Sequence, residues 1–197
     1  MNFWRPKRFT RQRGLLRGAN RGQRDPYSTG AQTKFMIHVI GWVYQVIVLD
    51  WYTKKIVGWD ISLRSRAKEW KSALEMAVQR EFPEGVKDKG LKLISDNGSQ
   101  PTATSFMKDM VTLGIEQIFT SYDNPKGNAD TERMMRTIKE EIIWLNEFAS
   151  LEEAKEKIGQ WIEVDYNKLN VHSQLVDIRP EEFEEQCRCR HTLEKAA

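Results

Sequence analysis

The fold is decided by Trp42-Val43-Tyr44-Gln45-Val46-Ile47-Val48-Leu49-Asp50, a run dominated by β-branched, aromatic and aliphatic residues. Such a run is typical of a strand buried within a sheet. Phe35–Ile40 reads as a strand that precedes it across a break at Gly41, and Lys54–Ile61 reads as a strand that follows it. These connections are too short for parallel pairing, which needs a crossover of a dozen or more residues. The sequence therefore predicts a three-stranded antiparallel meander.

Helices and strands alternate after the meander. Residues 67–82 carry Trp70, Leu74, Ala77 and Val78 at the spacing of one helical face, before Pro83 and Gly85 end the segment. Two more strands are predicted at 91–95 and 115–120, and three more helices at 104–113, 128–145 and 150–166. The predicted fold class is α/β: a mixed five-stranded sheet, three antiparallel strands then two entered through helices, flanked by helices.

Two of these helices carry specific expectations. In the 128–145 helix, the core stripe is predicted to be Met135, Ile138, Ile142 and Leu145. In the 150–166 helix, Ser150 is predicted to be the N-cap, because acidic residues follow it in the first turn.

Composition restricts the class of protein. The 197 residues include two cysteines, and no apolar run reaches the roughly 20 residues that span a bilayer, so the chain is expected to be soluble and intracellular. The net charge of +3 is uneven, since residues 1–24 hold eight Arg or Lys and no acid, which leaves −5 for the rest. This basic segment is open to two interpretations: contact with nucleic-acid phosphates, or an irregular solvated terminus.

Two acidic residues suggest a metal site. Asp96 directly follows the predicted 91–95 strand, and Glu132 lies near the start of the 128–145 helix, with 35 residues between them. Carboxylates brought together at a sheet edge repel unless a cation neutralises them, and carboxylate oxygens favour Mg²⁺ or Mn²⁺. Each residue also has a plain structural interpretation. Asp96-Asn97-Gly98 is a strong turn signal, and Glu132 could pair with Arg136 four residues later.

The chain at this point resembles the insertion-sequence transposases that carry a retroviral-integrase-type (DDE) catalytic core. The resemblance rests on the Trp42–Asp50 and Lys55–Trp59 strands, on Ile94–Gln100 as the second acidic motif, and on Asn128–Glu141 as the third. It extends to about Phe183, through Tyr166-Asn167-Lys168 and Pro180–Phe183. It implies a ribonuclease-H-like fold, and DNA strand cleavage and transfer at a two-metal Mg²⁺ or Mn²⁺ site held by Asp96 and Glu132. It also implies double-stranded DNA as partner, a homo-oligomer on that DNA, and a bacterial, nucleoid-associated location.

The first acid of the family motif is missing. Thr33 matches the Thr of the family's Trp-Gly-x-Asp-x-Thr pattern, so the Asp position falls on Ala31, which cannot bind a metal. Asp25 is a poor substitute, and Asp50 and Asp60 match scaffold positions. The resemblance therefore implies impaired catalysis. The alternatives are a catalytically inactive DNA-binding or assembly subunit, and a decayed transposase fragment in which an insertion or deletion near Thr33 shifted the upstream frame.

Four basic residues are candidates for DNA contact beside the metal site: Lys126, Arg133, Arg136 and Lys139. The turn-rich segment Ser121–Gly127 reads either as a loop over the site or as a plain connection. Cys187, Cys189 and His191 fit no common zinc spacing and are expected to lie in a solvated tail. His38 and His172 are expected to be structural.

These observations divide the chain into four parts. The divisions are a basic irregular N-terminal segment (1–32), an integrase-type catalytic core (33–148), a C-terminal helix and tail of that core (149–185), and a disordered tail (186–197).

Overall fold

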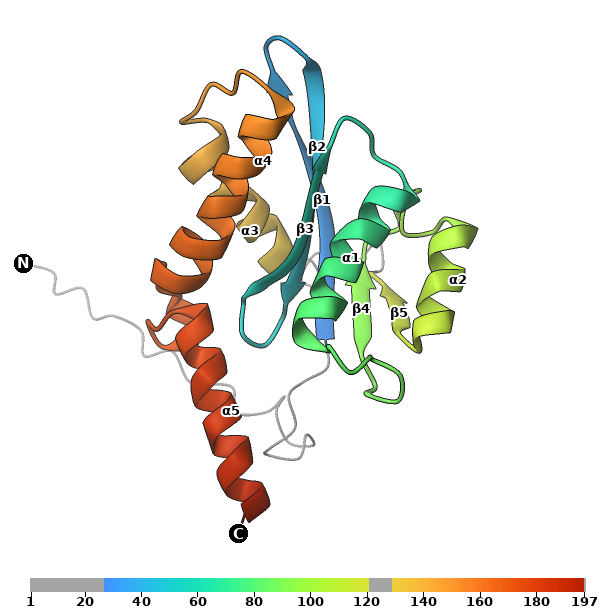
Figure 1. Cartoon of the computed structure of the whole chain (residues 1–197), viewed down its shortest axis with the longest axis vertical. Coiled ribbons are helices and arrows are strands. Elements are labelled where there is room, and N and C mark those ends of the chain that lie inside the picture. Colours follow the sequence, from blue (N-terminus) through green and yellow to red (C-terminus); the bar gives the residue numbers. More distant parts are fainter. Residues whose placement is uncertain (1–26, 121–128, 197) are drawn as a thin grey trace, which may run out of the picture.

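A single five-stranded sheet organises the molecule, which was analysed as a computed structural model that describes residues 27–120 and 129–196. The antiparallel part consists of β1 (Tyr27–Ile37), β2 (Gly41–Asp50) and β3 (Ile56–Ser62). Parallel to β1 lie β4 (Lys92–Ser95) and then β5 (Glu116–Phe119), which gives the order β3-β2-β1-β4-β5. The predicted mixed sheet is therefore confirmed (Figure 1).

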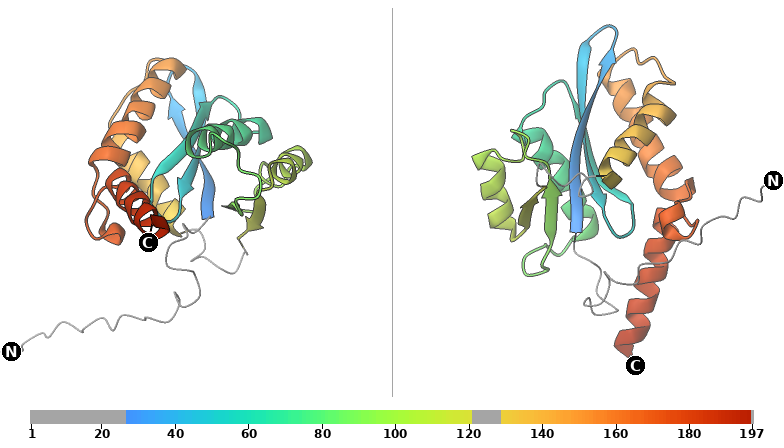
Figure 2. Two further views of the ribbon diagram at one scale, coloured as in Figure 1. Left: turned by 60° about the horizontal axis from the view of Figure 1, so that its bottom comes forward. Right: turned by 180° about the vertical axis from the view of Figure 1, so that it is seen from behind.

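Helices cover both faces of this sheet, as two opposite views show (Figure 2). One face carries α1 (Ala67–Glu81) and α2 (Thr104–Leu113). The other carries α3 (Ala129–Ile138), which continues into the π-helix η2 (Lys139–Ile143), and α4 (Leu151–Gln160), which continues into the π-helix η3 (Trp161–Leu169). A short η4 (Ser173–Leu175) and α5 (Pro180–Ala196) complete the chain. Within the described ranges, no helix is both long and apolar enough to cross a membrane.

Alternation along β2 separates two hydrophobic cores. Val46 and Val48 face α1 and α2, where they share a core with Trp70 and Leu74. The odd-numbered residues of β2, such as Ile47, face the opposite side, where the core is completed by α3, α4 and η3. Burial on both faces explains why β2 is almost continuously apolar rather than alternating with polar residues.

β1 begins earlier than the sequence pattern indicated. The expected irregular segment reached residue 32, but the strand starts at Tyr27, and Ser28 already pairs with Asp50. Pairing with two neighbours, β2 and β4, stabilises a stretch whose own composition is not strand-like. Gly30 is required there because a Cβ atom would lie 2.8 Å from the Trp70 ring.

The predicted stripe of the 128–145 helix is partly wrong. Met135 and Ile138 are buried, but Leu145 is 73% exposed, and Ile143 is buried instead. The cause is η2, because the wider π-helical turn shifts the phase of the side chains after Ile138. The cap prediction for the next helix is confirmed, since Ser150 Oγ accepts a hydrogen bond from the Glu153 amide at 3.1 Å.

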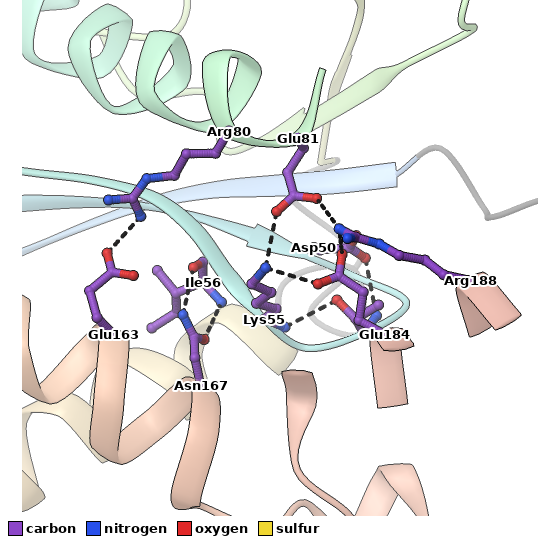
Figure 3. A network of polar contacts seen from close by, with 10 residues as sticks. Asp50, Lys55, Ile56, Arg80, Glu81, Glu163, Asn167, Glu184 and Arg188 are labelled. Carbon is purple, nitrogen blue, oxygen red and sulfur yellow. Dashed lines mark hydrogen bonds and ion pairs between the residues drawn. The ribbon is translucent and has the colours of Figure 1, made fainter. Parts of the chain in front are cut away.

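The expected disordered tail at 186–197 is also corrected, because α5 continues as a helix to Ala196. The first half of α5 is held to the β2–β3 turn by a polar cluster that we call the Lys55 clamp (Lys55, Glu81, Glu184 and Arg188; Figure 3). Lys55 Nζ lies 3.2 Å from a Glu81 oxygen and 2.9 Å from a Glu184 oxygen, and Arg188 lies 3.1 Å from Glu184. Both glutamate side chains are less than one-tenth exposed.

A buried amide completes the edge of the sheet beside this clamp. Asn167 of η3 accepts a hydrogen bond from the Ile56 amide at 2.9 Å and donates one to the Ile56 carbonyl at 3.0 Å (Figure 3). The Tyr166 hydroxyl donates to the Lys54 carbonyl at 2.9 Å. These two neighbours therefore fasten η3 to the β2–β3 turn and to the first residue of β3.

Gln45 of β2 provides a test of the core. Its side chain is fully buried, and neither its amide nitrogen nor its amide oxygen has a hydrogen-bond partner among the described residues. Leaving such groups unpaired costs roughly 1–3 kcal/mol. We therefore expect Gln45→Leu to increase the free energy of unfolding in urea by about 1–3 kcal/mol. The matched exposed change, Gln79→Leu, should stay within about 0.5 kcal/mol. A loss of stability in Gln45→Leu would contradict this account of the core.

Candidate functional site

Asp96 lies where the sequence placed it, immediately after β4. Its side chain is exposed, and Oδ1 accepts a hydrogen bond from the Gly98 amide at 3.0 Å. Asn97 Nδ2 donates to the Thr120 carbonyl, just past β5, at 3.0 Å. The turn interpretation of Asp96-Asn97-Gly98 is thus correct, and the turn still leaves the carboxylate open to solvent at the carboxyl end of a parallel strand. Ligand sites gather at such strand ends in open sheets.

Glu132 lies in the first half of α3, the helix that packs against β1. Its neighbours Thr131, Met134 and Met135 are buried, whereas Glu132 itself is exposed. Among the described residues it forms no ion pair with Arg136, so the plain structural interpretation does not hold. Its carboxylate remains available.

Ala31 lies on β1, between the elements that carry these two acids. The last parallel pair between β1 and β4 is Thr29 with Ile94, so Ala31 and Asp96 each lie two residues beyond that pair. The Ala31 side chain is buried in the same core as Met134 and Met135 of α3. The structure thus puts Ala31 on a strand that pairs with β4, which ends just before Asp96, and that also contacts α3, which carries Glu132.

The donor set falls short of a two-metal site. Within the described ranges, no group of three or more His, Cys, Asp or Glu residues is arranged to hold a metal ion. Asp25 lies outside the described residues. Asp50 Oδ1 instead accepts hydrogen bonds from the Tyr52 and Thr53 amides at 2.8 and 3.1 Å, which closes the β2–β3 turn.

Asp60, on β3, is also engaged by neighbouring protein groups, as Asp50 is. Burial raises the pKa of its carboxyl above the ordinary value, while a hydrogen bond from Ser72 and the charge of Lys155 oppose that effect. Its partners come from α1 and α4, so this carboxyl belongs to the packing of the β3 edge.

A hydrogen-bond network that the sequence analysis did not anticipate supports the Asp96 turn. Gln32 Oε1, on β1, accepts from Ser65 Oγ at 2.7 Å and from Trp70 Nε1 at 3.0 Å. Gln100 Nε2 in turn donates to Ser65 Oγ at 2.8 Å. The segment after Asp96 is therefore tied to β1 and to the start of α1. Gln100 belongs to the acidic motif, but no local pattern indicated its distant partners.

The basic candidates for DNA contact are partly described. Arg133 and Arg136 are exposed on α3, and Lys139 is half-buried at the start of η2. Lys126 and the rest of the Ser121–Gly127 segment lie outside the described residues. The expectation that this segment forms a loop over the site or a plain connection therefore stays a prediction. Arg133 and Arg136 lie on the same helix as Glu132, and Lys139 lies at the start of the π-helix that continues it. Positive charge is therefore close to an exposed carboxylate.

The cysteine and histidine side chains that the structure describes lie in ordinary packing or exposed positions. The Cys187 thiol is half-buried, 3.9 Å from the Tyr52 hydroxyl, and Cys189 is an exposed free thiol. The ring of His172 packs edge-on against Tyr166, with 5.3 Å between the ring centroids. His38 is exposed in the β1–β2 turn rather than on a strand.

Comparison with protein families gives two overlapping matches. One model described as an integrase core domain matches residues 27–125, about half of the chain. A second model of the same description matches residues 113–180.

Curated relatives are insertion-sequence transposases. The transposase for element IS904 of Lactococcus lactis is 31% identical over 144 residues, which cover 73% of this chain and 55% of that protein. The transposase InsF for IS3A of Escherichia coli is 26% identical over 180 residues, which cover 88% of this chain and 61% of that protein. The chain therefore spans about 55 to 61% of the length of these relatives.

Solved structures share the fold. The catalytic core of BIV integrase superposes with a TM-score of 0.60 at 16% identity, covering 86% of this chain and 99% of that one. The HTLV-2 integrase core, solved in complex with magnesium, gives 0.59 at 16% identity, covering 80% and 94%. The Mos1 transposase catalytic domain, solved with Mn, gives 0.53 at 18% identity, covering 72% and 71%. The fold is ribonuclease-H-like, as the sequence resemblance implied.

Proposed function

Because the chain belongs to the integrase core domain family of insertion-sequence transposases, we propose that Asp96 and Glu132 are the second and third acids of a DNA strand-transfer site whose first acid position is occupied by Ala31. The observation that supports this proposal is the β1–β4 register, whose last pair, Thr29 with Ile94, comes two residues before Ala31 and Asp96, together with the shared core of Ala31 and the helix that bears Glu132. In the complete site, paired divalent metals would activate the attacking oxygen and stabilise the leaving one. With two carboxylates in place of three, the chain is expected to perform little or no strand transfer.

DNA binding does not depend on the missing acid. Arg133, Arg136 and Lys139 would contact phosphates of double-stranded DNA at the element ends or target, and the fold that presents them is intact. We further propose a homo-oligomer on DNA and, given relatives from Lactococcus lactis and Escherichia coli, a bacterial, nucleoid-associated protein.

The phosphate contacts are tested by the salt dependence of binding. In Arg133→Ala/Arg136→Ala, affinity for duplex DNA should fall, and the slope of log affinity against log salt should decrease by about 1 for each phosphate that is no longer neutralised. Fluorescence anisotropy with a labelled duplex in EDTA measures both quantities. Arg179→Ala, on the C-terminal side of the molecule where Arg179 pairs with Glu182 at 2.9 Å, is the matched control. An unchanged slope in the α3 double variant would contradict binding of DNA through α3.

A second candidate function is a catalytically inactive DNA-binding or assembly subunit. The burial of Ala31 among apolar side chains favours it, since this position is filled as core rather than left as an open ligand position. Manganese titration separates the candidates: a retained metal site should give saturable Mn²⁺ binding that Asp96→Asn abolishes. A decayed fragment is tested in the gene, where a shifted reading frame upstream of Thr33 should encode a Trp-Gly-x-Asp peptide.

A further inference from the structure

The β1–β2 hairpin extends beyond the helix that covers one of its faces. Figure 1 shows the hairpin rising past the end of α1, while α4 follows it on the opposite side. On the edge of β1 away from β2, β4 pairs only with Tyr27–Thr29, so none of the described strands lies on that edge farther along. On the face turned toward α1, large side chains near the tip of the hairpin are exposed.

This exposed face combines aromatic and cationic side chains. Met36 is 54% exposed and Trp42, its partner across the hairpin, is 48% exposed. Lys34 and Tyr44 form the next pair along the same face, and Lys34 Nζ lies 4.7 Å from the centre of the Trp42 ring. Such exposure is unusual for side chains of this size, which normally pack against a covering element.

Positive charge continues from this face toward the proposed site. Ser62 pairs with Tyr44, and the β3–α1 loop that follows carries exposed Arg64 and, at the start of α1, exposed Lys68. Two acids flank this loop in the sequence: Glu69 is buried and engaged by Arg66 at 3.1 Å, and Asp60 is half-buried with a hydrogen bond from Ser72. Ser65 of this loop accepts a hydrogen bond from Gln100, so the surface is continuous with the turn that holds Asp96.

We propose that this surface, formed by Lys34, Met36, Trp42, Tyr44, Arg64 and Lys68, binds an unpaired stretch of DNA beside the Asp96 turn. The inference rests on the proposed function and extends it. Cations alone would serve a duplex equally well, but exposed aromatic rings next to cations are the combination that holds single strands, with bases against the rings and phosphates on the charges.

The test compares two probes, a labelled single-stranded 20-mer and the blunt duplex of the same sequence, by fluorescence anisotropy in EDTA. Trp42→Ala is expected to weaken single-strand binding about tenfold and duplex binding less than about twofold. Lys34→Ala should weaken binding of both probes and lower the single-strand salt slope by about 0.7. Trp42→Phe, which keeps a ring, should restore most of the single-strand affinity.

Trp144→Ala is the matched control, because Trp144 is 67% exposed and follows η2 on the opposite face of the sheet. It should leave both affinities unchanged. The proposal is overturned if Trp42→Ala affects neither probe, affects both equally, or matches Trp144→Ala, and also if it changes self-association in sedimentation without changing DNA affinity. If α3 variants lose duplex binding while Trp42→Ala has no effect, the hairpin proposal fails and the proposed function stands. If the wild-type chain binds no DNA, both fail.

Discussion

Ala31→Asp is expected to make the stability of this protein depend on divalent metal. Without metal, the new carboxylate would be buried at a position only 8% exposed, on a strand that pairs with β4 and contacts the α3 helix that carries Glu132. Burying a charge without a partner costs several kcal/mol, so the variant should lose about 3 kcal/mol of unfolding free energy in EDTA. In the proposed site, this carboxylate with Asp96 and Glu132 would form a set that Mg²⁺ or Mn²⁺ can neutralise.

Added metal should restore most of that loss. At a free Mn²⁺ concentration about 100 times the dissociation constant, binding to the folded state alone adds about 2.7 kcal/mol. Urea unfolding with and without Mn²⁺ measures the linkage, and the same variant should nick DNA in the presence of Mn²⁺ more than the parent chain does. Ala31→Asn is the matched control, because an amide of the same shape should show neither effect. If Ala31→Asp unfolds at the same urea concentration in EDTA and in Mn²⁺, or if Asp96→Asn in that background leaves the metal effect intact, the assignment of the site is wrong.

Lys55→Met is expected to produce the largest loss of stability in the parent chain. The substitution keeps most of the side-chain volume but removes the lysine that bridges Glu81 and Glu184, which are almost fully buried, and leaves them to the charge of Arg188, whose side chain is 63% exposed. Removing one partner of a buried ion pair costs about 3–5 kcal/mol. Urea unfolding measures this loss, and limited proteolysis of α5 reports whether the helix separates from the β2–β3 turn.

The control for this variant is Lys71→Met. Lys71 also pairs with two acids, Asp109 at 3.1 Å and Glu75 at 3.8 Å, but its side chain is 43% exposed. Solvent screening should limit its effect to less than about 1 kcal/mol. If both variants lose the same small amount of stability, the Lys55 clamp has no special role.

The pH dependence of the clamp follows from Lys55. Burial alone would lower its pKa, but the hydrogen bonds and charges of Glu184 and Glu81 outweigh burial and hold the pKa above its ordinary value of 10.5. A lysine with a raised pKa in the folded state stabilises fully below its unfolded pKa, and that contribution is lost as the pH rises through the folded pKa. The stability difference between wild type and Lys55→Met should thus be constant between about pH 7 and 10 and shrink only at higher pH. A difference that disappears below about pH 9 would contradict this.

The sequence pattern correctly predicted those strands and helices whose buried residues recur with a regular spacing. The apolar run through Trp42–Asp50 and the helical spacing from Trp70 to Ala77 predicted their elements correctly, because burial on both faces of a strand or one face of a helix leaves a direct signature. The start of β1 was missed because it depends on pairing with β2 and β4 rather than on its own composition. The phase shift in η2 left no signal either, since a π-helical turn has no simple sequence pattern.

The candidate site divides in the same way. Asp96 and Ala31 were identified by matching motifs, whereas the β1–β4 register, which pairs Thr29 with Ile94, is a property of the assembled sheet. The Gln32–Ser65–Gln100 network joins residues 33 and 35 positions apart, and Lys55 of the clamp bonds to residues 26 and 129 positions away. Contacts of that kind cannot be inferred from a single sequence. The exposed hairpin face was equally hidden, because Met36 and Trp42 look like core residues until the length of α1 is known.

The Lys55 clamp holds α5 through Glu184 and Arg188, and the helix then projects away from the sheet (Figure 1). From Arg188 to Ala196 it extends about 12 Å at 1.5 Å per residue. A tilt of about 10° about the clamp would therefore move the end of α5 by roughly 2 Å. The clamp thus sets the direction in which the C-terminal half of α5 leaves the sheet.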